Sequence, residues 1–248
     1  MRRLLRENGL SIVWLGLFFL TLIFGQSLAG HREYNSDQLE HGQRVVSLAQ
    51  YLGTGHFVEA LFENWESEFL QMAMFVVLTA ILRQKGSPES KKLQGSEEVD
   101  EDPREARDRP GVPWPVRHGG LALRLYEHSL TIALTLLFVA SLALHALGGA
   151  SEYNDEQRAH GGETITALAY MATSRFWFES FQNWQSEFFS VGMLVVLSIY
   201  LRQRGSSQSK PVASPHSETG QGGGDGEQPP KQREPVKQTE RKRARRAS

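Results

Sequence analysis

Four long apolar segments separate the polar parts of the chain. Asp, Glu, Lys and Arg are absent from the first and third segments and lie near the start of the second and fourth. A bilayer core is about 30 Å thick and a helix rises about 1.5 Å per residue, so about 20 residues cross it. The pattern predicts an all-α integral membrane protein with four transmembrane helices, at about residues 10–29, 65–82, 128–147 and 184–201.

The first segment has a second interpretation, as a secretory signal peptide. Arginines precede it, and Ser27-Leu28-Ala29 resembles a cleavage site. The apolar run is longer than the usual core of about 7–15 residues in a signal peptide. A matching segment also recurs in mid-chain, where no signal peptide stands. We therefore expect a retained transmembrane helix.

The second segment is short unless its helix begins before the apolar run. Residues 69–82 alone number about 14, too few to span a bilayer. The helix must therefore include Trp65, and this places Glu68 close to the outer membrane boundary.

One sequence motif occurs twice. The pattern F-x-N-W-x-S-E-F covers residues 62–69 and again 181–188, an offset of 119. The pairs Tyr34-Asn35 and His41-Gly42 recur at the same offset. This predicts a tandem duplication of a two-helix unit. Two spans per unit insert both units the same way up, as parallel repeats.

Charge and composition predict the domain boundaries and the orientation. The expected order is a first repeat (1–92), a disordered charged and Pro-rich linker (93–116), a second repeat (117–209) and a disordered basic tail (210–248). Basic residues flank one side of all four apolar segments, which the positive-inside rule assigns to the cytoplasm. We expect a multi-pass protein of a bacterial cytoplasmic (inner) membrane with both termini, linker and tail inside.

The net charge of −1 implies no global attraction to nucleic acid. The lipid bilayer is the expected partner, and assembly into a homo-oligomer through the hairpin faces is an open expectation. No aromatic residues interleave with the basic residues of the tail, so no nucleic-acid binding is expected. Anionic lipid is the predicted contact of the terminal cluster Arg241, Lys242, Arg243, Arg245 and Arg246.

Several short motifs resemble a bacterial membrane-protein family known only as a domain of unknown function. They are the start Leu4-Leu5-Arg6-Glu7-Asn8-Gly9-Leu10, the Tyr-Asn and His-Gly pairs, the Asn-Trp-x-Ser-Glu-Phe motif and the trailing Arg-Gln-Lys-Gly-Ser-x-x-Ser-Lys. The second copy departs from the pattern, with Glu127-His128-Ser129 in place of Glu7-Asn8-Gly9 and Gln182 in place of Glu63. The resemblance implies a membrane location and no defined activity.

The paired polar residues at the start of the second and fourth segments are the sharpest functional candidates. Asn64 and Glu68 in the first copy correspond to Asn183 and Glu187 in the second. A carboxylate inside a membrane is costly and usually faces a bundle interior, where two of them would share a proton or hold a cation. The alternative is that each carboxylate reaches water at the interface and stabilises a helix N-terminus.

Other candidates have simpler structural explanations. Trp65 and Trp184 are expected to be interfacial anchors. His41 and His160 each follow an acidic residue by four positions, which would suit an outward-facing metal site, but no further ligand motif supports it and turn or loop packing explains the same residues. His145 is left aside, since the first repeat has no matching histidine.

No nucleotide-binding, hydrolase or other catalytic motif is present, so we expect no enzyme activity and no cofactor. The chain has no cysteine, which excludes disulfides and thiolate sites. Three functions are left open: a structural or interaction component of the bacterial envelope, a small cation or proton channel or transporter using Glu68 and Glu187, and a metal-binding module using His41 and His160.

Overall fold

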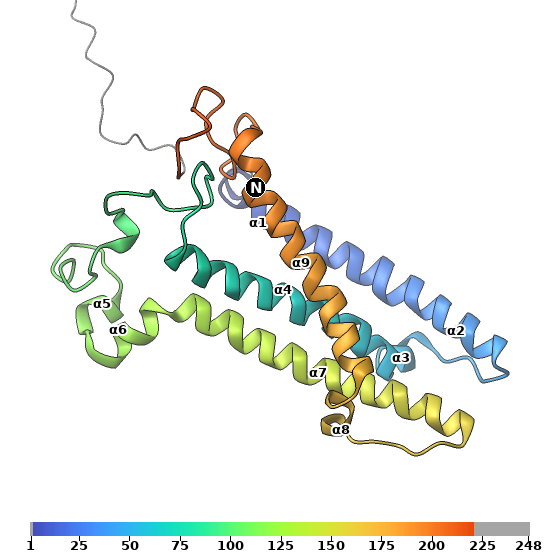
Figure 1. Cartoon of the computed structure of the whole chain (residues 1–248). Helices are drawn as coiled ribbons and strands as arrows, with labels where there is room; N and C mark the ends of the chain where they lie inside the picture. Colours follow the sequence, from blue (N-terminus) through green and yellow to red (C-terminus); the bar gives the residue numbers. More distant parts are fainter. Residues whose placement is uncertain (1, 221–248) are drawn as a thin grey trace, which may run out of the picture. The chain divides into compact units, whose positions relative to one another are not determined.

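The computed structural model describes residues 2–220, and all of its regular structure is helical, with no strand in that range. The all-α prediction is therefore confirmed. Figure 1 shows the helices in chain order: α1 (Arg2–Leu20), η1 (Thr21–Ala29), α2 (Gly30–Glu40), α3 (Leu48–Tyr51), α4 (Gly55–Ile81), η2 (Glu98–Asp100), α5 (Trp114–His118), α6 (Gly120–Glu127), α7 (Ser129–His160), α8 (Ala167–Met171) and α9 (Ser174–Tyr200).

The chain forms two compact units. The first contains residues 1–81 and 100–193, and the second contains residues 82–99 and 194–248, of which the structure describes those up to 220. The predicted linker, 93–116, contributes to both, with turns, the short η2 and the start of α5. The basic cluster predicted at 241–246 lies outside the described residues.

Within residues 2–220, two helical segments are long and apolar enough to cross a membrane. They are Arg3–Glu40, with 38 residues, and Ser129–His160, with 32. Both continue past the predicted spans, because α2 and the last turns of α7 extend the helices into sequence with the polarity of a loop. The middle of the first segment, η1, is a nine-residue π-helix, in which Ser27 donates to the carbonyl of Leu22, five residues earlier (2.9 Å).

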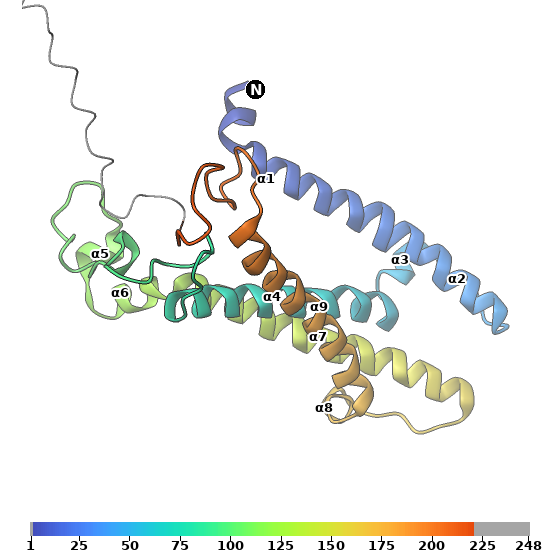
Figure 2. The same ribbon diagram turned by 45° about the horizontal axis from the view of Figure 1, so that its top comes forward.

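The first unit is centred on the contact between α4 and α7, which run antiparallel beside each other (Figure 2). Their backbones approach closely because glycines face the partner helix. A Cβ atom at Gly148 would lie 2.5 Å from the amide nitrogen of Glu59, and one at Gly55 would lie 2.5 Å from that of Glu152. Small residues allow such close helix contact in membrane proteins.

The repeated Asn of the Tyr-Asn pair closes the loop after each long helix. Asn35 accepts from the amide of Val46 (2.8 Å) and donates to its carbonyl (3.0 Å). Asn154 makes the same two hydrogen bonds with Ile165, at 2.7 and 2.9 Å. The repeated asparagines thus satisfy backbone groups of the loop, a structural role that needs an amide with both a donor and an acceptor.

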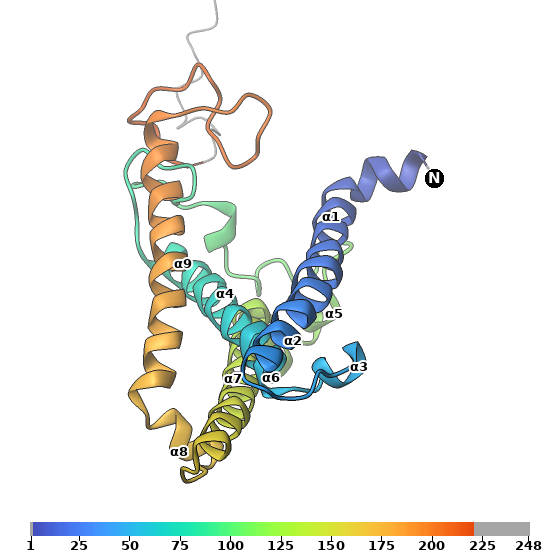
Figure 3. The same cartoon turned by 90° about the vertical axis from the view of Figure 1, so that its right-hand side faces the viewer.

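In both halves of the first unit, a tyrosine side chain packs against a glycine. A Cβ atom at Gly30 would collide with the hydroxyl of Tyr51, and one at Gly149 with the ring of Tyr170. Tyr170 belongs to a buried cluster with Ala146, Ala150 and Phe176, which come from α7, α8 and the start of α9. Figure 3 shows α8 next to α7 and the start of α9.

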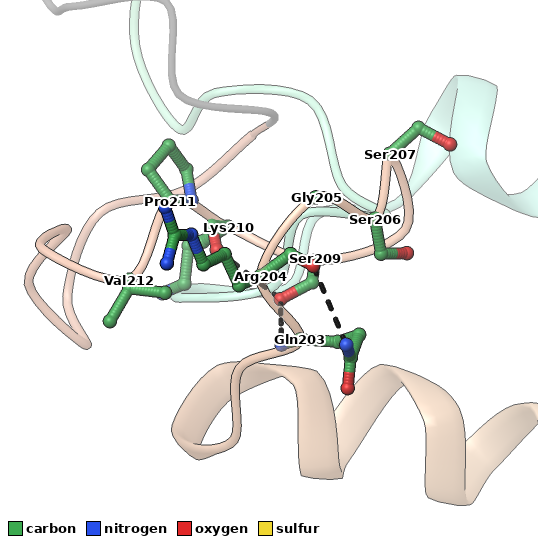
Figure 4. Close-up of a pocket in the computed structure, with 9 residues that line it drawn as sticks. All are labelled: Gln203, Arg204, Gly205, Ser206, Ser207, Ser209, Lys210, Pro211 and Val212. Atoms are coloured by element: carbon green, nitrogen blue, oxygen red, sulfur yellow. Dashed lines mark hydrogen bonds between the residues drawn. The ribbon is translucent and has the colours of Figure 1, made fainter.

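The described part of the second unit contains the last turns of α9 and the loops that follow α4 and α9. Ser90 accepts a hydrogen bond from the amide of Gln84 (2.8 Å), and Ser209 accepts one from the amide of Gln203 (2.9 Å), again at the offset of 119. Figure 4 shows the latter turn. Nearby Lys210 is 1% exposed, and its ammonium donates to three backbone carbonyls at 2.9–3.2 Å. The serine contacts explain by backbone capping why the spacing of serines recurs in the two trailing motifs.

Candidate functional site

The paired polar residues predicted from the repeat do not bond to one another. Asn64 and Asn183 donate to carbonyls of their own helices, at 2.8 and 3.1 Å. Glu68 is exposed and Glu187 is half-buried, and no hydrogen bond joins the two carboxylates. Glu68 and Asn64 line a cavity of about 260 Å³ with Gln26 and Trp65.

The predicted metal-site histidines are exposed, and their ring nitrogens are engaged locally. His41 Nδ1 lies 2.9 Å from the carbonyl of Asp37, and His160 Nδ1 lies 2.8 Å from that of Glu156. Both carbonyls are four residues earlier in the same chain segment, which is the geometry of a side chain that caps a helix end.

The buried polar site of the first unit centres instead on His145 of α7. Its side chain is 0% exposed, and its ring stacks on Phe176 at a centroid distance of 4.8 Å. Nδ1 lies 2.9 Å from Oε2 of Glu66, a residue of α4 that is also 0% exposed. The other oxygen of Glu66 accepts a hydrogen bond from the indole of Trp184 at 3.1 Å. Glu66 therefore holds the imidazole with Nδ1 as the donor.

Glu179 of α9 faces the other ring nitrogen. His145 Nε2 is 3.5 Å from Glu179 Oε2, within ion-pair distance, but it is buried and has no hydrogen-bond partner. The hydroxyl of Tyr170 donates to the same oxygen at 2.6 Å and also lies 3.1 Å from Oε1 of Glu59, which is 8% exposed. One phenolic proton thus stands between two carboxylates.

Arg175 connects the buried groups to the surface. Its Nε donates to Glu179 Oε1 (2.9 Å), and a terminal nitrogen donates to the half-exposed Glu156 at 2.6 Å. Helical spacing places Arg175 and Glu179 on one face of α9, and Glu59 and Glu66 on one face of α4.

Carboxylates outnumber cations in this network. One guanidinium and one imidazole face the four carboxylates of Glu59, Glu66, Glu156 and Glu179. Buried charges are costly unless opposite charges compensate them. The network thus carries an excess of negative charge even if the histidine is protonated.

The pKa values around Tyr170 reflect this charge. These groups precede the apolar segments 65–82 and 184–201. Burial, then the hydrogen bond to Glu179 and the charge of Glu59, raise the pKa of the Tyr170 hydroxyl, so it stays a neutral donor. Burial and the charge of Glu179 raise the pKa of Glu59 to about 7. Burial alone would raise the pKa of Glu179 too, but polar contacts from His145, Tyr170 and Arg175 hold it below its usual range.

Residues that both repeats share do not predict this site. At the offset of 119, His145, Glu179, Glu59 and Glu66 correspond to residues of other types, namely Gln26, Ala60, Phe178 and Gln185. The sequence feature that does indicate the site is a difference between the repeats: ionisable residues in or beside the apolar segments that occur in one copy only.

The fold and the site define an all-helical protein with two helices long and apolar enough to cross a membrane and a buried histidine–carboxylate network. The chain belongs to the family described as a domain of unknown function (DUF6766), whose model matches residues 1–221. No curated protein and no solved structure matches it.

The two repeated tryptophans give a matched test of the network. Trp184→Phe removes the hydrogen bond to Glu66, and a bond to a charged group contributes about 1.5–3 kcal/mol. The indole nitrogen of Trp65 has no hydrogen-bond partner in the described chain, and Trp65→Phe changes only packing against rings such as Phe18. We expect Trp184→Phe to lower the free energy of unfolding in detergent by about 1.5–3 kcal/mol more than Trp65→Phe. Equal losses would indicate that both rings act only as interfacial anchors.

Proposed function

We propose that this chain is a four-span protein of a bacterial cytoplasmic membrane that binds a metal cation in the His145 network. The spans are the apolar segments 10–29, 65–82, 128–147 and 184–201. Large apolar side chains exposed on their helices support membrane insertion: Val13 is 60%, Leu136 65% and Phe189 67% exposed. In water such exposure is costly, whereas lipid accommodates it.

Matching contacts support the arrangement as two tandem hairpins. Three kinds of contact recur at an offset of 119. They are the hydrogen bonds of Asn35 and Asn154 to the loop backbone, the tyrosine–glycine pairs and the serine-capped turns. A duplicated unit with two spans places both loops on one side of the membrane. The basic residues that flank the segments favour the outside for these loops and the cytoplasm for the termini.

The cation-binding proposal rests on one observation, the position of a buried histidine between carboxylates. His145 lies between Glu66 and Glu179, with Glu59 on the far side of Tyr170, and the carboxylates exceed the available positive charge. Ionisable groups inside a helical bundle usually serve ion or proton handling. A bound cation would neutralise the excess charge. Glu156, half-exposed at the surface end of the network, marks the side from which a cation enters.

A structural role in the envelope is the second candidate. The glycine-mediated contact between α4 and α7 and the Glu66–His145 contact across it favour this role, because together they fix how the helices pack. In that case the network stabilises the bundle and no ion changes its stability.

Single cysteines test the membrane topology, since the chain has none of its own. Arg44→Cys and Glu163→Cys occupy matching exposed loop positions, and Gln94→Cys lies between the repeats. We expect a membrane-impermeant maleimide to label positions 44 and 163 in intact cells and position 94 only in inverted vesicles. Labelling of 44 and 163 from opposite sides would contradict the parallel hairpins.

Thermal unfolding of the purified chain in detergent tests cation binding. After treatment with a chelator, we expect at least one of Na⁺, K⁺, Mg²⁺, Ca²⁺, Mn²⁺ or Zn²⁺ to raise the melting temperature saturably. An ion present at 100 times its Kd stabilises the folded state by about 2.7 kcal/mol. Glu59→Gln removes one carboxylate and should reduce this increment, whereas the exposed control His160→Gln should not. If no cation changes the wild-type melting temperature, the structural role is favoured.

A further inference from the structure

We propose that Glu59, His145 and Glu179 bind a divalent transition-metal ion of the zinc class, with Glu66 as the residue that positions His145. This inference rests on the proposed cation-binding function and names the ion and its ligands. One donor atom from each of the three residues lies within 4.8 Å of the others. Glu59 comes from α4, His145 from α7 and Glu179 from α9, so an ion here would join three helices.

The distance between His145 and Glu179 suits two ligands of one metal. Zinc binds nitrogen and oxygen at about 2.0–2.2 Å, so neighbouring ligands of a tetrahedral ion stand about 3.4 Å apart. His145 Nε2 and Glu179 Oε2 are 3.5 Å apart, too far for a strong hydrogen bond. Modest side-chain rotation of Glu59 would complete the set.

The contact of His145 with Glu66 leaves Nε2 of the imidazole available as a metal ligand. Nδ1 faces the carboxylate of Glu66 at 2.9 Å and must donate its proton there, so in the neutral imidazole the lone pair is on Nε2. Nε2 is the buried atom without a hydrogen-bond partner, and a buried unsatisfied polar atom costs about 1–3 kcal/mol. A metal-binding histidine usually donates its other ring N–H to a carboxylate, which orients the ring. Glu66, itself hydrogen-bonded by Trp184, would have this role here.

The two carboxylates are also held by outer contacts. Arg175 donates to Oε1 of Glu179, while Oε2 accepts from the Tyr170 hydroxyl and faces Nε2 of His145. Tyr170, hydrogen-bonded to both carboxylates, orients them toward a common point. Two carboxylates and a neutral imidazole carry a charge of −2, which a divalent ion neutralises.

The ligand types indicate the class of ion. Imidazole suits zinc, copper, iron and nickel ions, whereas Ca²⁺ takes six to eight oxygen ligands and Mg²⁺ keeps an octahedral shell of oxygens. One nitrogen and two carboxylate oxygens leave a coordination position for water, as in zinc sites with three protein ligands. At the offset of 119, His145, Glu179 and Glu59 correspond to Gln26, Ala60 and Phe178, so the ligand set has no second copy and we expect one ion per chain.

Cobalt serves as the probe, because Co²⁺ in a four- or five-coordinate protein site absorbs visible light strongly. The full-length chain, purified in detergent and stripped with a chelator, is titrated with Co²⁺ and then with Zn²⁺. We expect one Co²⁺ per chain, a visible band, and its loss when Zn²⁺ displaces it. His145→Gln should weaken binding at least 100-fold, and Glu66→Gln by about 10–100-fold, as for other outer-shell partners.

The control is His160→Gln, an exposed histidine outside the network, which should bind Co²⁺ like the wild type. If His145→Gln does not fold, X-ray absorption spectroscopy of the zinc-loaded wild-type chain tests the site instead. A zinc ion coordinated by one imidazole nitrogen and by oxygen ligands supports it. Binding that His145→Gln leaves unchanged overturns the inference. Stabilisation by Na⁺ or Ca²⁺ without Co²⁺ binding overturns this inference but leaves the cation-binding function intact. No response to any cation overturns both.

Discussion

The contact between Glu66 and His145 is the interaction on which the rest of the site depends. It joins α4 to α7 through two side chains that are both 0% exposed. Removal of one partner from such a buried pair leaves an uncompensated group, which typically costs about 3–5 kcal/mol. The contact also determines the tautomer of the imidazole, and so directs Nε2 toward Glu179 and Glu59. Helix packing and ligand geometry therefore share one cause.

The close approach of α4 and α7 makes this contact available. Gly55 and Gly148 let the backbones meet where a Cβ atom would come within 2.5 Å of the partner helix. Glu59 and Glu66 then lie on the face of α4 that meets α7, and His145 lies on the facing side of α7. A bulkier residue at Gly148 would separate the helices and lengthen the contacts of the whole network.

The structural roles of residues that both repeats share differ from those of residues that occur in one copy only. Asn35 and Asn154 satisfy loop backbones in the same way, and Tyr51 and Tyr170 cover equivalent glycines. Glu59, Glu66, His145 and Glu179 of the buried network have no such counterparts. In the arrangement that we propose, a duplicated hairpin provides the scaffold, and differences between its copies provide the chemistry.

The sequence predicted the fold better than the site. An all-helical chain with long apolar helices follows from composition and segment length, which are local properties. Four spans and tandem repeats stay predictions. The continuation of α7 to His160 was not predicted, because the polar residues after Leu147 have the composition of a loop. The role of His145 depends on Glu66, 79 residues away in the chain, and no local pattern encodes that contact.

The most direct test of the account is a double-mutant cycle between these two residues. The free energies of unfolding of the wild type, Glu66→Gln, His145→Gln and the double variant are compared in detergent with chelator present. Residues in direct contact in a buried network couple by about 0.5–3 kcal/mol, and we expect about 2 kcal/mol or more here. Additivity within about 0.5 kcal/mol would show that the two side chains do not interact, and would contradict the account.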